Sequence, residues 1–294
     1  MLNLASESEF GSPAKHEQGN VKVSTTQRLV ESAVLLAMAV VLSILKLFEL
    51  PYGGSVTVAS MFPVMLIAYR HGLGYGLISA TVFGGIQQLF GLKNLSYVSS
   101  WQSVLAVIML DYIVAFAVIG FGGSFRKRFG SNQALQLVCG SLLVCLLRYA
   151  CHVISGATVC AGLSIPTKAA LAYSLAYNAT YMVPETIVLV TVAYFLGNSL
   201  NFRLPTPVRV NSSKQNRIPV FTIIGLFIAA AAVIADVALI FSKLQDAETG
   251  NWNIHGFSEV NWIVVAVITG IGVVAAVALI IVDRRAAKRA AGNE

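Results

Sequence analysis

The sequence predicts an all-α integral membrane protein, consisting of a six-helix bundle followed by a C-terminal two-helix transmembrane hairpin. The composition favours this class, because 56% of the residues are hydrophobic, only 11% are charged and the mean hydropathy is +0.75. Apolar runs of about 20 residues recur along the chain, which is the length that a helix needs to cross a hydrocarbon layer of about 30 Å. No water satisfies backbone groups in that layer, so we expect these runs to be helices.

Eight apolar segments are candidates for spans, and the second is short. A polar outer loop separates the last two. We expect the spans at Leu29–Leu50, Met61–Tyr69, Leu73–Phe90, Val104–Phe125, Leu135–Ala157, Ala169–Leu200, Ile218–Phe241 and Trp262–Val282.

These spans divide the chain into four parts. Residues 1–24 are polar and lack the apolar core of a signal peptide, so we expect a disordered cytoplasmic tail. Residues 25–200 hold the first six spans and most of the polar residues within spans. Residues 201–216 contain two prolines, and we expect them to form a cytoplasmic linker. We expect residues 217–294 to form the hairpin with its basic cytoplasmic tail.

The distribution of basic residues predicts the orientation. The formal net charge of +7 would suit a nucleic-acid partner, but most of the twenty Lys and Arg residues fall on one side of the predicted membrane. Cytoplasmic loops carry such an excess, so we expect a multi-pass protein of the cell membrane with both termini in the cytoplasm and no nucleic-acid partner.

The first outer loop, residues 51–58, combines two glycines with alternating β-branched residues. This pattern favours an extended or turning segment that packs onto the protein, directly before the short second span. An ordinary connection to a tilted helix is the alternative.

A set of polar residues interrupts otherwise apolar spans. A charge at the bilayer centre costs roughly 2.5–3.5 kcal/mol or more, so such residues are commonly functional. At about 1.5 Å of rise per residue, three spans bring these groups to similar depths in the outer half of the membrane, which predicts an outward-facing pocket. The set is Asp111, Tyr112, Arg148, His152, Tyr173 and Asn178.

The chemistry of these residues suits a small, aromatic and partly cationic ligand. Asp111 offers a carboxylate that accepts from an amino group or balances positive charge. Aromatic rings for stacking or cation–π contact, worth roughly 0.5–2 kcal/mol each, are Trp101, Tyr112, His152 and Tyr173. The amide of Asn178 both donates and accepts, and so can orient the ligand.

Each of these residues also has a purely structural interpretation. Asp111 can form an ion pair with Arg148. Hydrogen bonds between helices would explain His152 and Asn178, and Tyr173 can belong to the aromatic belt at the membrane surface.

Two further acidic residues lie in spans. Glu185 follows Pro184 deeper in the sixth span, where it suits a partner for a backbone or Arg group as well as a ligand contact. Asp236, in the seventh span, has no evident partner. The sequence shows no metal-ligand spacing, activated nucleophile or phosphate-binding P-loop, so we expect no cofactor, no metal and no enzyme activity.

Several short motifs, in order, carry a resemblance to a known family. Over roughly residues 26–200 the chain resembles the thiamine-specific substrate-binding (S) components of energy-coupling factor (ECF) transporters. The motifs are Pro51-Tyr52-Gly53-Gly54-Ser55-Val56-Thr57, Pro63 with Tyr69-Arg70-His71-Gly72, Leu110-Asp111-Tyr112, Arg148-Tyr149 with His152, and Ala172-Tyr173-Ser174-Leu175-Ala176 with Asn178.

The resemblance implies a six-helix protein that binds thiamine from outside and joins one membrane coupling protein and two ATPase subunits. Asp111 then takes the place of the acid that contacts the pyrimidine ring. The matching ligand contacts are Tyr112, His152, Tyr173 and Asn178, and Trp101 stands where the family has a tyrosine contact.

The resemblance also assigns a docking motif and shows three departures. Ala33 and Ala37 match a small-xxx-small motif on the first helix that docks on the coupling protein, where small residues permit close packing. The family's acid is usually Glu, two of its tryptophans fall at Gly54 and Cys160, and the C-terminal hairpin lies outside its six helices.

We therefore expect membrane-embedded, high-affinity thiamine binding and uptake as the S component of an ATP-driven ECF transporter. A standalone proton-coupled secondary transporter, with Asp111 and His152 exchanging protons, is the main alternative. An intramembrane enzyme using the same two residues as acid and base, and a structural protein whose polar residues only join helices, are two others.

Overall fold

The computed structural model describes residues 23–50, 53–98, 100–130, 132–159, 168–210, 220–244 and 254–292. Most of the predicted tail, residues 211–216 of the predicted linker, the Pro51-Tyr52 pair and Cys160 lie outside the described residues.

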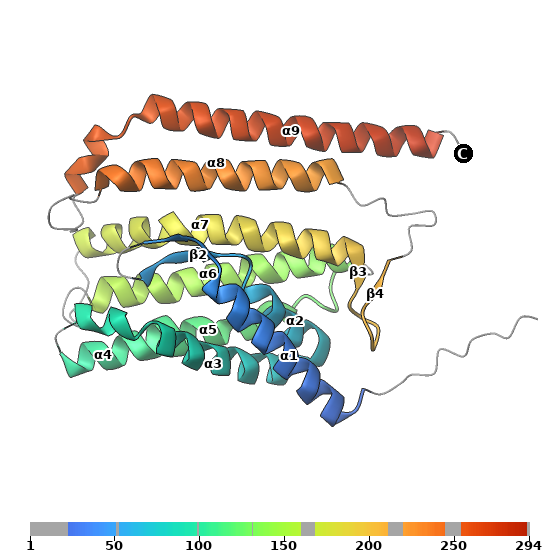
Figure 1. Ribbon diagram of the computed structural model, residues 1–294, viewed down its shortest axis with the longest axis horizontal. Coiled ribbons are helices and arrows are strands. Elements are labelled where there is room, and N and C mark those ends of the chain that lie inside the picture. Colours follow the sequence, from blue (N-terminus) through green and yellow to red (C-terminus); the bar gives the residue numbers. More distant parts are fainter. Residues whose placement is uncertain are drawn as a thin grey trace, which may run out of the picture.

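The first part of the chain is a helical bundle (Figure 1). One long helical segment, from Trp101 to Gly123, changes its helical type along its length and has a π-helical stretch, η3, in its middle. The helices are α1 (Thr25–Ile44), α2 (Met61–His71), α3 (Leu73–Phe90), η2 (Leu92–Tyr97), α4 (Trp101–Val107), η3 (Ile108–Val114), α5 (Ala115–Ala117), η4 (Val118–Gly123), α6 (Gln133–Val159) and α7 (Lys168–Ser199).

A helical hairpin follows the bundle and packs on it through α7. Figure 1 shows α8 beside α7, and α9 on the outer side of α8. Within the hairpin, Thr269 on α9 donates a hydrogen bond to the buried carboxylate of Asp236 on α8. Asp236 therefore has a partner that the sequence did not reveal. The elements are α8 (Val220–Leu244), η5 (Ile254–Glu259) and α9 (Trp262–Gly292).

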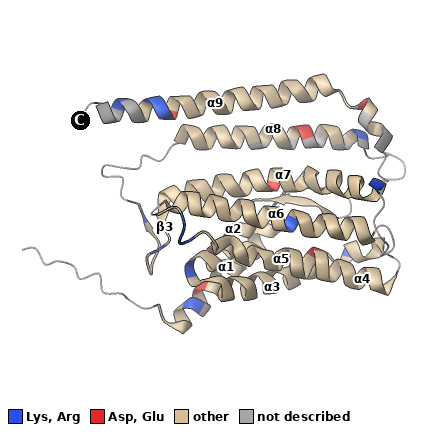
Figure 2. Ribbon diagram, turned by 180° about the vertical axis from the view of Figure 1, so that it is seen from behind, with Lys and Arg blue, Asp and Glu red and all other residues tan. Residues whose placement is uncertain are grey.

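The protein is an all-α integral membrane protein, as predicted. Figure 2 shows few charged residues along the middle of the helices. Five helical stretches of the described chain are long and apolar enough to cross a membrane, whereas the predicted eight crossings and the boundaries of the four parts remain predictions. The five are Thr25–Ile44, Trp101–Gly123, Gln133–Val159, Ala170–Ser199 and Trp262–Ala286.

The first helix ends earlier than predicted. It stops at Ile44 instead of Leu50, and β1 (Lys46–Glu49) follows and pairs antiparallel with β2 (Ser55–Thr57). The charged ends of β1 disfavour its continuing as a lipid-facing helix, and the strand pair satisfies its backbone. The outer loop is thus an extended segment packed onto the protein, as expected.

The short second span is an interior helix. Every residue from Met61 to Arg70 is buried, and α2 packs against α1, α3 and η4. Since a helix of 11 residues is too short to cross the bilayer alone, its burial inside the bundle keeps its ends away from lipid.

Arg70, at the end of α2, joins three parts of the chain. Its guanidinium forms an ion pair with Glu31 on α1. It also donates to the carbonyl oxygens of Phe202, Leu204 and Pro205, in the segment that follows α7. The side chain of Arg70 is only 4% exposed, so this network fixes the start of the linker against α1 and α2.

Candidate binding site

A cavity of about 1410 Å³ lies between the β1–β2 strand pair, η2, η3, α6 and α7. All six of the predicted intramembrane polar residues line it, with others of the same elements. They are Asp111, Tyr112, Arg148, His152, Tyr173 and Asn178. The described residues around the cavity thus bring together side chains that are more than 60 positions apart in the sequence.

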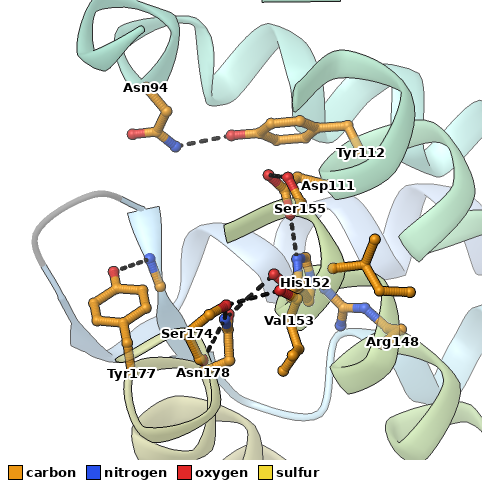
Figure 3. Close-up of polar contacts among 12 residues, drawn as sticks. Asn94, Asp111, Tyr112, Arg148, His152, Val153, Ser155, Ser174, Tyr177 and Asn178 are labelled. Carbon is orange, nitrogen blue, oxygen red and sulfur yellow. Dashed lines mark hydrogen bonds and ion pairs between the residues drawn. The ribbon is translucent and has the colours of Figure 1, made fainter. Parts of the chain in front are cut away.

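Two side chains from α6 hold the Asp111 carboxylate (Figure 3). Ser155 donates to Oδ2 over 2.6 Å, and Nδ1 of His152 lies 2.8 Å from Oδ1. Asp111 belongs to the π-helical stretch η3, and π-helical turns are frequent at functional sites. Its side chain stays 26% exposed, which leaves the carboxylate accessible from the cavity.

The predicted alternative of an ion pair between Asp111 and Arg148 is wrong. Among the described residues the ion-pair partner of Asp111 is His152. Arg148 and His152 lie four positions apart on one face of α6. The Asp111 carboxylate is opposite His152 and not opposite Arg148. Arg148 instead stacks over the ring of Phe116, 4.3 Å from its centre.

Tyr112 is fixed by the segment that follows α3. Its hydroxyl accepts a hydrogen bond from Nδ2 of Asn94 at 2.8 Å and lies 3.4 Å from the carbonyl oxygen of Gly91. A Cβ atom at Gly91 would lie 2.0 Å from that hydroxyl, so only glycine permits the approach. The ring also stacks on Phe116, with 6.4 Å between centroids.

A row of tyrosines forms the α7 wall. Tyr173 stacks on Tyr177 with 6.1 Å between ring centroids, and Tyr177 meets Tyr181 edge-on at 5.9 Å. The spacing of four residues places all three on one helix face. Of the three, only Tyr173 was predicted from the sequence, although this spacing was a signal for Tyr177 and Tyr181.

The tyrosines of α7 occupy the space beside Gly54. A Cβ atom at Gly54 would lie 2.6 Å from the Tyr181 ring. The backbone N–H of Gly54 lies 3.4 Å from the hydroxyl of Tyr177. The aromatic surface on this side of the cavity therefore comes from α7, because position 54 of the outer loop has no room for a side chain.

Asn178 connects α6 and α7. Its Nδ2 donates to the carbonyl oxygen of Ser174 at 2.8 Å and to that of His152 at 3.3 Å, while Oδ1 accepts from the hydroxyl of Tyr181 at 2.5 Å. The interhelical hydrogen bond considered for this residue is therefore present. Asn178 also lines the cavity.

Glu185, buried deeper on α7, anchors the outer loop. Its carboxylate accepts from the backbone N–H of Thr57 at 2.6 Å and from the Thr57 hydroxyl at 2.8 Å. This is the backbone partnership that the sequence suggested as one alternative. It ties β2 to α7 and so closes one side of the cavity.

A charged cluster joins the strand pair to η2 at the mouth of the cavity. Glu49 lies 2.9 Å from Nζ of Lys93 and 3.0 Å from Nζ of Lys46. Hydrogen bonds from Lys93 and Lys46 lower the pKa of the Glu49 carboxyl below its usual value.

The structure does not bring Trp101 into this group. The residue begins α4 with 72% of its surface exposed and does not line the cavity. Ala33 and Ala37 lie on α1, four residues apart and exposed, so the bundle leaves that face of the helix uncovered. Among the described residues, no group of three or more His, Cys, Asp or Glu side chains is placed to hold a metal ion.

Comparison with known proteins gives two findings. The sequence model of the family described as thiamine transporter protein matches residues 29–202. The thiamine transporter ThiT of Bacillus subtilis (strain 168) is 38% identical over 180 residues, which cover 58% of this chain and 89% of that protein. The family match includes the helices that form the cavity and ends before the C-terminal hairpin begins.

Proposed function

The chain belongs to the thiamine transporter protein family, and on this premise we propose that it binds thiamine in the Asp111 cavity as the S component of an ECF transporter. Thiamine joins an aminopyrimidine to a positively charged thiazolium ring. The cavity offers matching groups, namely a carboxylate and several aromatic faces.

The observation that carries the proposal is the environment of the Asp111 carboxylate. Each oxygen has one protein partner at hydrogen-bond distance, His152 or Ser155, and an ionised carboxylate oxygen accepts about two hydrogen bonds. One acceptor position on each oxygen therefore remains for N–H groups of the ligand. The aromatic faces of Tyr112 and the α7 tyrosines suit both rings of thiamine.

Coupling to an ATP-driven module is the second part of the proposal. The sequence contains no P-loop, so energy from ATP would have to come from partner subunits. The exposed small residues Ala33 and Ala37 on α1 suit close packing against a helix of a membrane coupling protein. We place the protein in the cell membrane with both termini in the cytoplasm.

Uptake into proteoliposomes tests the coupling. We expect labelled thiamine to accumulate only when the coupling protein, two ATPase subunits and enclosed Mg-ATP accompany the chain. Accumulation by the chain alone, driven by a proton gradient, would instead establish the standalone secondary transporter.

A variant pair separates docking from binding. Ala33→Leu combined with Ala37→Leu should abolish uptake while thiamine binding in detergent stays within about threefold of wild type. Val34→Leu, an exposed substitution on the same helix, is the matched control and should leave uptake unchanged. Unchanged uptake in the double variant would refute docking through this face.

A further inference from the structure

The guanidinium of Arg148 faces the ring nitrogen of His152 that Asp111 does not use. Arg148 lies one turn before His152 on α6, and its Nη2 is 3.4 Å from Nε2 of the imidazole. A guanidinium carries only donors and stays charged in proteins. The favourable arrangement is therefore one in which Nε2 has no proton and accepts.

The other ring nitrogen then carries the proton. A neutral imidazole has one N–H, so an accepting Nε2 leaves the proton on Nδ1. This nitrogen lies 2.8 Å from Oδ1 of Asp111, where it can donate. The opposite tautomer would direct an N–H at the guanidinium and a lone pair at the carboxylate, and both contacts would repel.

We propose that Arg148 is a positioning residue, which holds His152 as the neutral Nδ1–H tautomer and thereby keeps Asp111 as a hydrogen-bonded carboxylate turned to the ligand. The inference rests on the proposed function for its ligand, thiamine. It assigns to Arg148 an action through His152 and Asp111 and no contact with thiamine.

The surroundings of Arg148 support this assignment. The residue is 8% exposed, and in the part of the chain that the structure describes no carboxylate forms an ion pair with it. Its other contacts are the Phe116 ring at 4.3 Å and the sulfur of Met61 at 2.8 Å. Because no carboxylate is paired with this buried cation, its charge acts strongly on the imidazole 3.4 Å away.

The remaining neighbours of His152 do not fix its tautomer, which therefore depends on the charges of Asp111 and Arg148. Tyr181 presents its ring at 68° to the imidazole, with 6.0 Å between centroids. Its hydroxyl already donates to Asn178. Glu185, which lines the same cavity, accepts from Thr57.

The tautomer has a consequence for ligand selection. With Nδ1–H donating to Oδ1 and Ser155 donating to Oδ2, the free acceptor positions of Asp111 suit a ligand that donates N–H groups. An analogue that offers a lone pair in place of the amino group would meet the carboxylate without a donor. Arg148 thereby contributes to selectivity for amino-substituted rings.

Nitrogen NMR of the full-length protein tests the inference directly. The chain has four histidines, so ¹⁵N-histidine labelling gives few ring signals, and the spectrum of His152→Gln assigns the relevant pair. We expect wild-type His152 without ligand to show a protonated Nδ1 and an unprotonated Nε2. The proposal would be overturned by a protonated Nε2, or by an imidazolium with both nitrogens protonated at about pH 7.5, near neutrality. This measurement needs only the wild-type protein.

Arg148→Met tests the action of the guanidinium, because methionine fills similar space without a donor or charge. We expect its His152 signals to lose the single Nδ1–H pattern and the Kd for thiamine to rise about tenfold. Arg148→Lys, which keeps a charged donor, should restore both in part, and the exposed Arg128→Met is the matched control. An unchanged tautomer and Kd in Arg148→Met would contradict the proposal.

The two claims fail separately. If wild-type protein shows the expected tautomer but does not bind thiamine, the proposed function is wrong and the positioning role stands. If thiamine binds and Nε2 is protonated, the proposed function stands and the positioning role is wrong.

Discussion

Replacing Asp111 with Asn removes the charge of the proposed anchor with little change of shape. The carboxylate has two oxygens, each engaged by one α6 donor at 2.6–2.8 Å. In the variant, one of these oxygens becomes an NH₂ group. It needs an acceptor, and it takes a position that the ligand's N–H group would otherwise use.

The expected loss follows from the hydrogen bonds involved. A hydrogen bond to a charged group contributes about 1.5–3 kcal/mol, and the Asp111 side chain is 26% exposed, so partial solvent screening favours the lower part of this range. Asp111→Asn should therefore raise the Kd for thiamine roughly 10- to 40-fold, since 1.4 kcal/mol corresponds to a factor of ten.

Isothermal titration of protein in detergent measures this change. Asp236→Asn is the matched control, because it makes the same substitution at a buried Asp of the C-terminal hairpin, away from the cavity. Its Kd should equal that of wild type. A Kd for Asp111→Asn within threefold of wild type, in folded protein, would refute the role of this carboxylate.

Three further predictions concern the elements that support the cavity. Gly91→Ala places a Cβ atom 2.0 Å from the Tyr112 hydroxyl and should lower the free energy of unfolding by about 1–3 kcal/mol, which thermal unfolding would show as a lower Tm. Gly85→Ala is the control and should not lower Tm, because nothing lies within 4 Å of its new Cβ atom. Arg70→Gln removes the guanidinium that pairs with Glu31 and donates to three carbonyl groups, and should cost about 2–4 kcal/mol. The exposed Arg209→Gln should change Tm little; equal Tm values for the two variants would contradict the role given to Arg70. The lowered pKa of Glu49 means that its ionised form stabilises the fold above the carboxyl's unfolded pKa and that this contribution disappears as pH falls through the folded pKa. The Tm difference between wild type and Glu49→Gln should then shrink between pH 6 and pH 3 (a window spanning the usual Glu pKa of about 4.3), and a constant difference would contradict the lysine contacts.

Hydropathy predicted the positions of the helices well, because contact with lipid requires apolar side chains along the whole length of a span. The end of α1 was missed, since the apolar residues of β1 continue the run of apolar residues and only strand pairing distinguishes them. The π-helical stretch around Asp111 was also missed. The sequence of Ile108–Val114 gives no sign of its helical type, which packing decides.

The candidate site was predictable where residues repeat along one helix. Tyr177 and Tyr181 follow Tyr173 at four-residue spacing, and Ser155 follows His152 at three. Asn94 gave no such signal, because its contact with Tyr112 depends on how η2 folds back over the cavity. Nor does helical spacing tell whether Arg148 or His152 reaches Asp111, since that depends on the relative height of two helices.

The central claim is that the cavity around Asp111 binds thiamine from outside the membrane. Equilibrium titration of the purified wild-type chain with thiamine tests it most directly. We predict saturable binding of one thiamine per chain with a Kd in the micromolar range or below, which corresponds to about −8 kcal/mol or stronger. Absence of binding up to about 100 µM thiamine, a free energy weaker than roughly −5.5 kcal/mol, would contradict it.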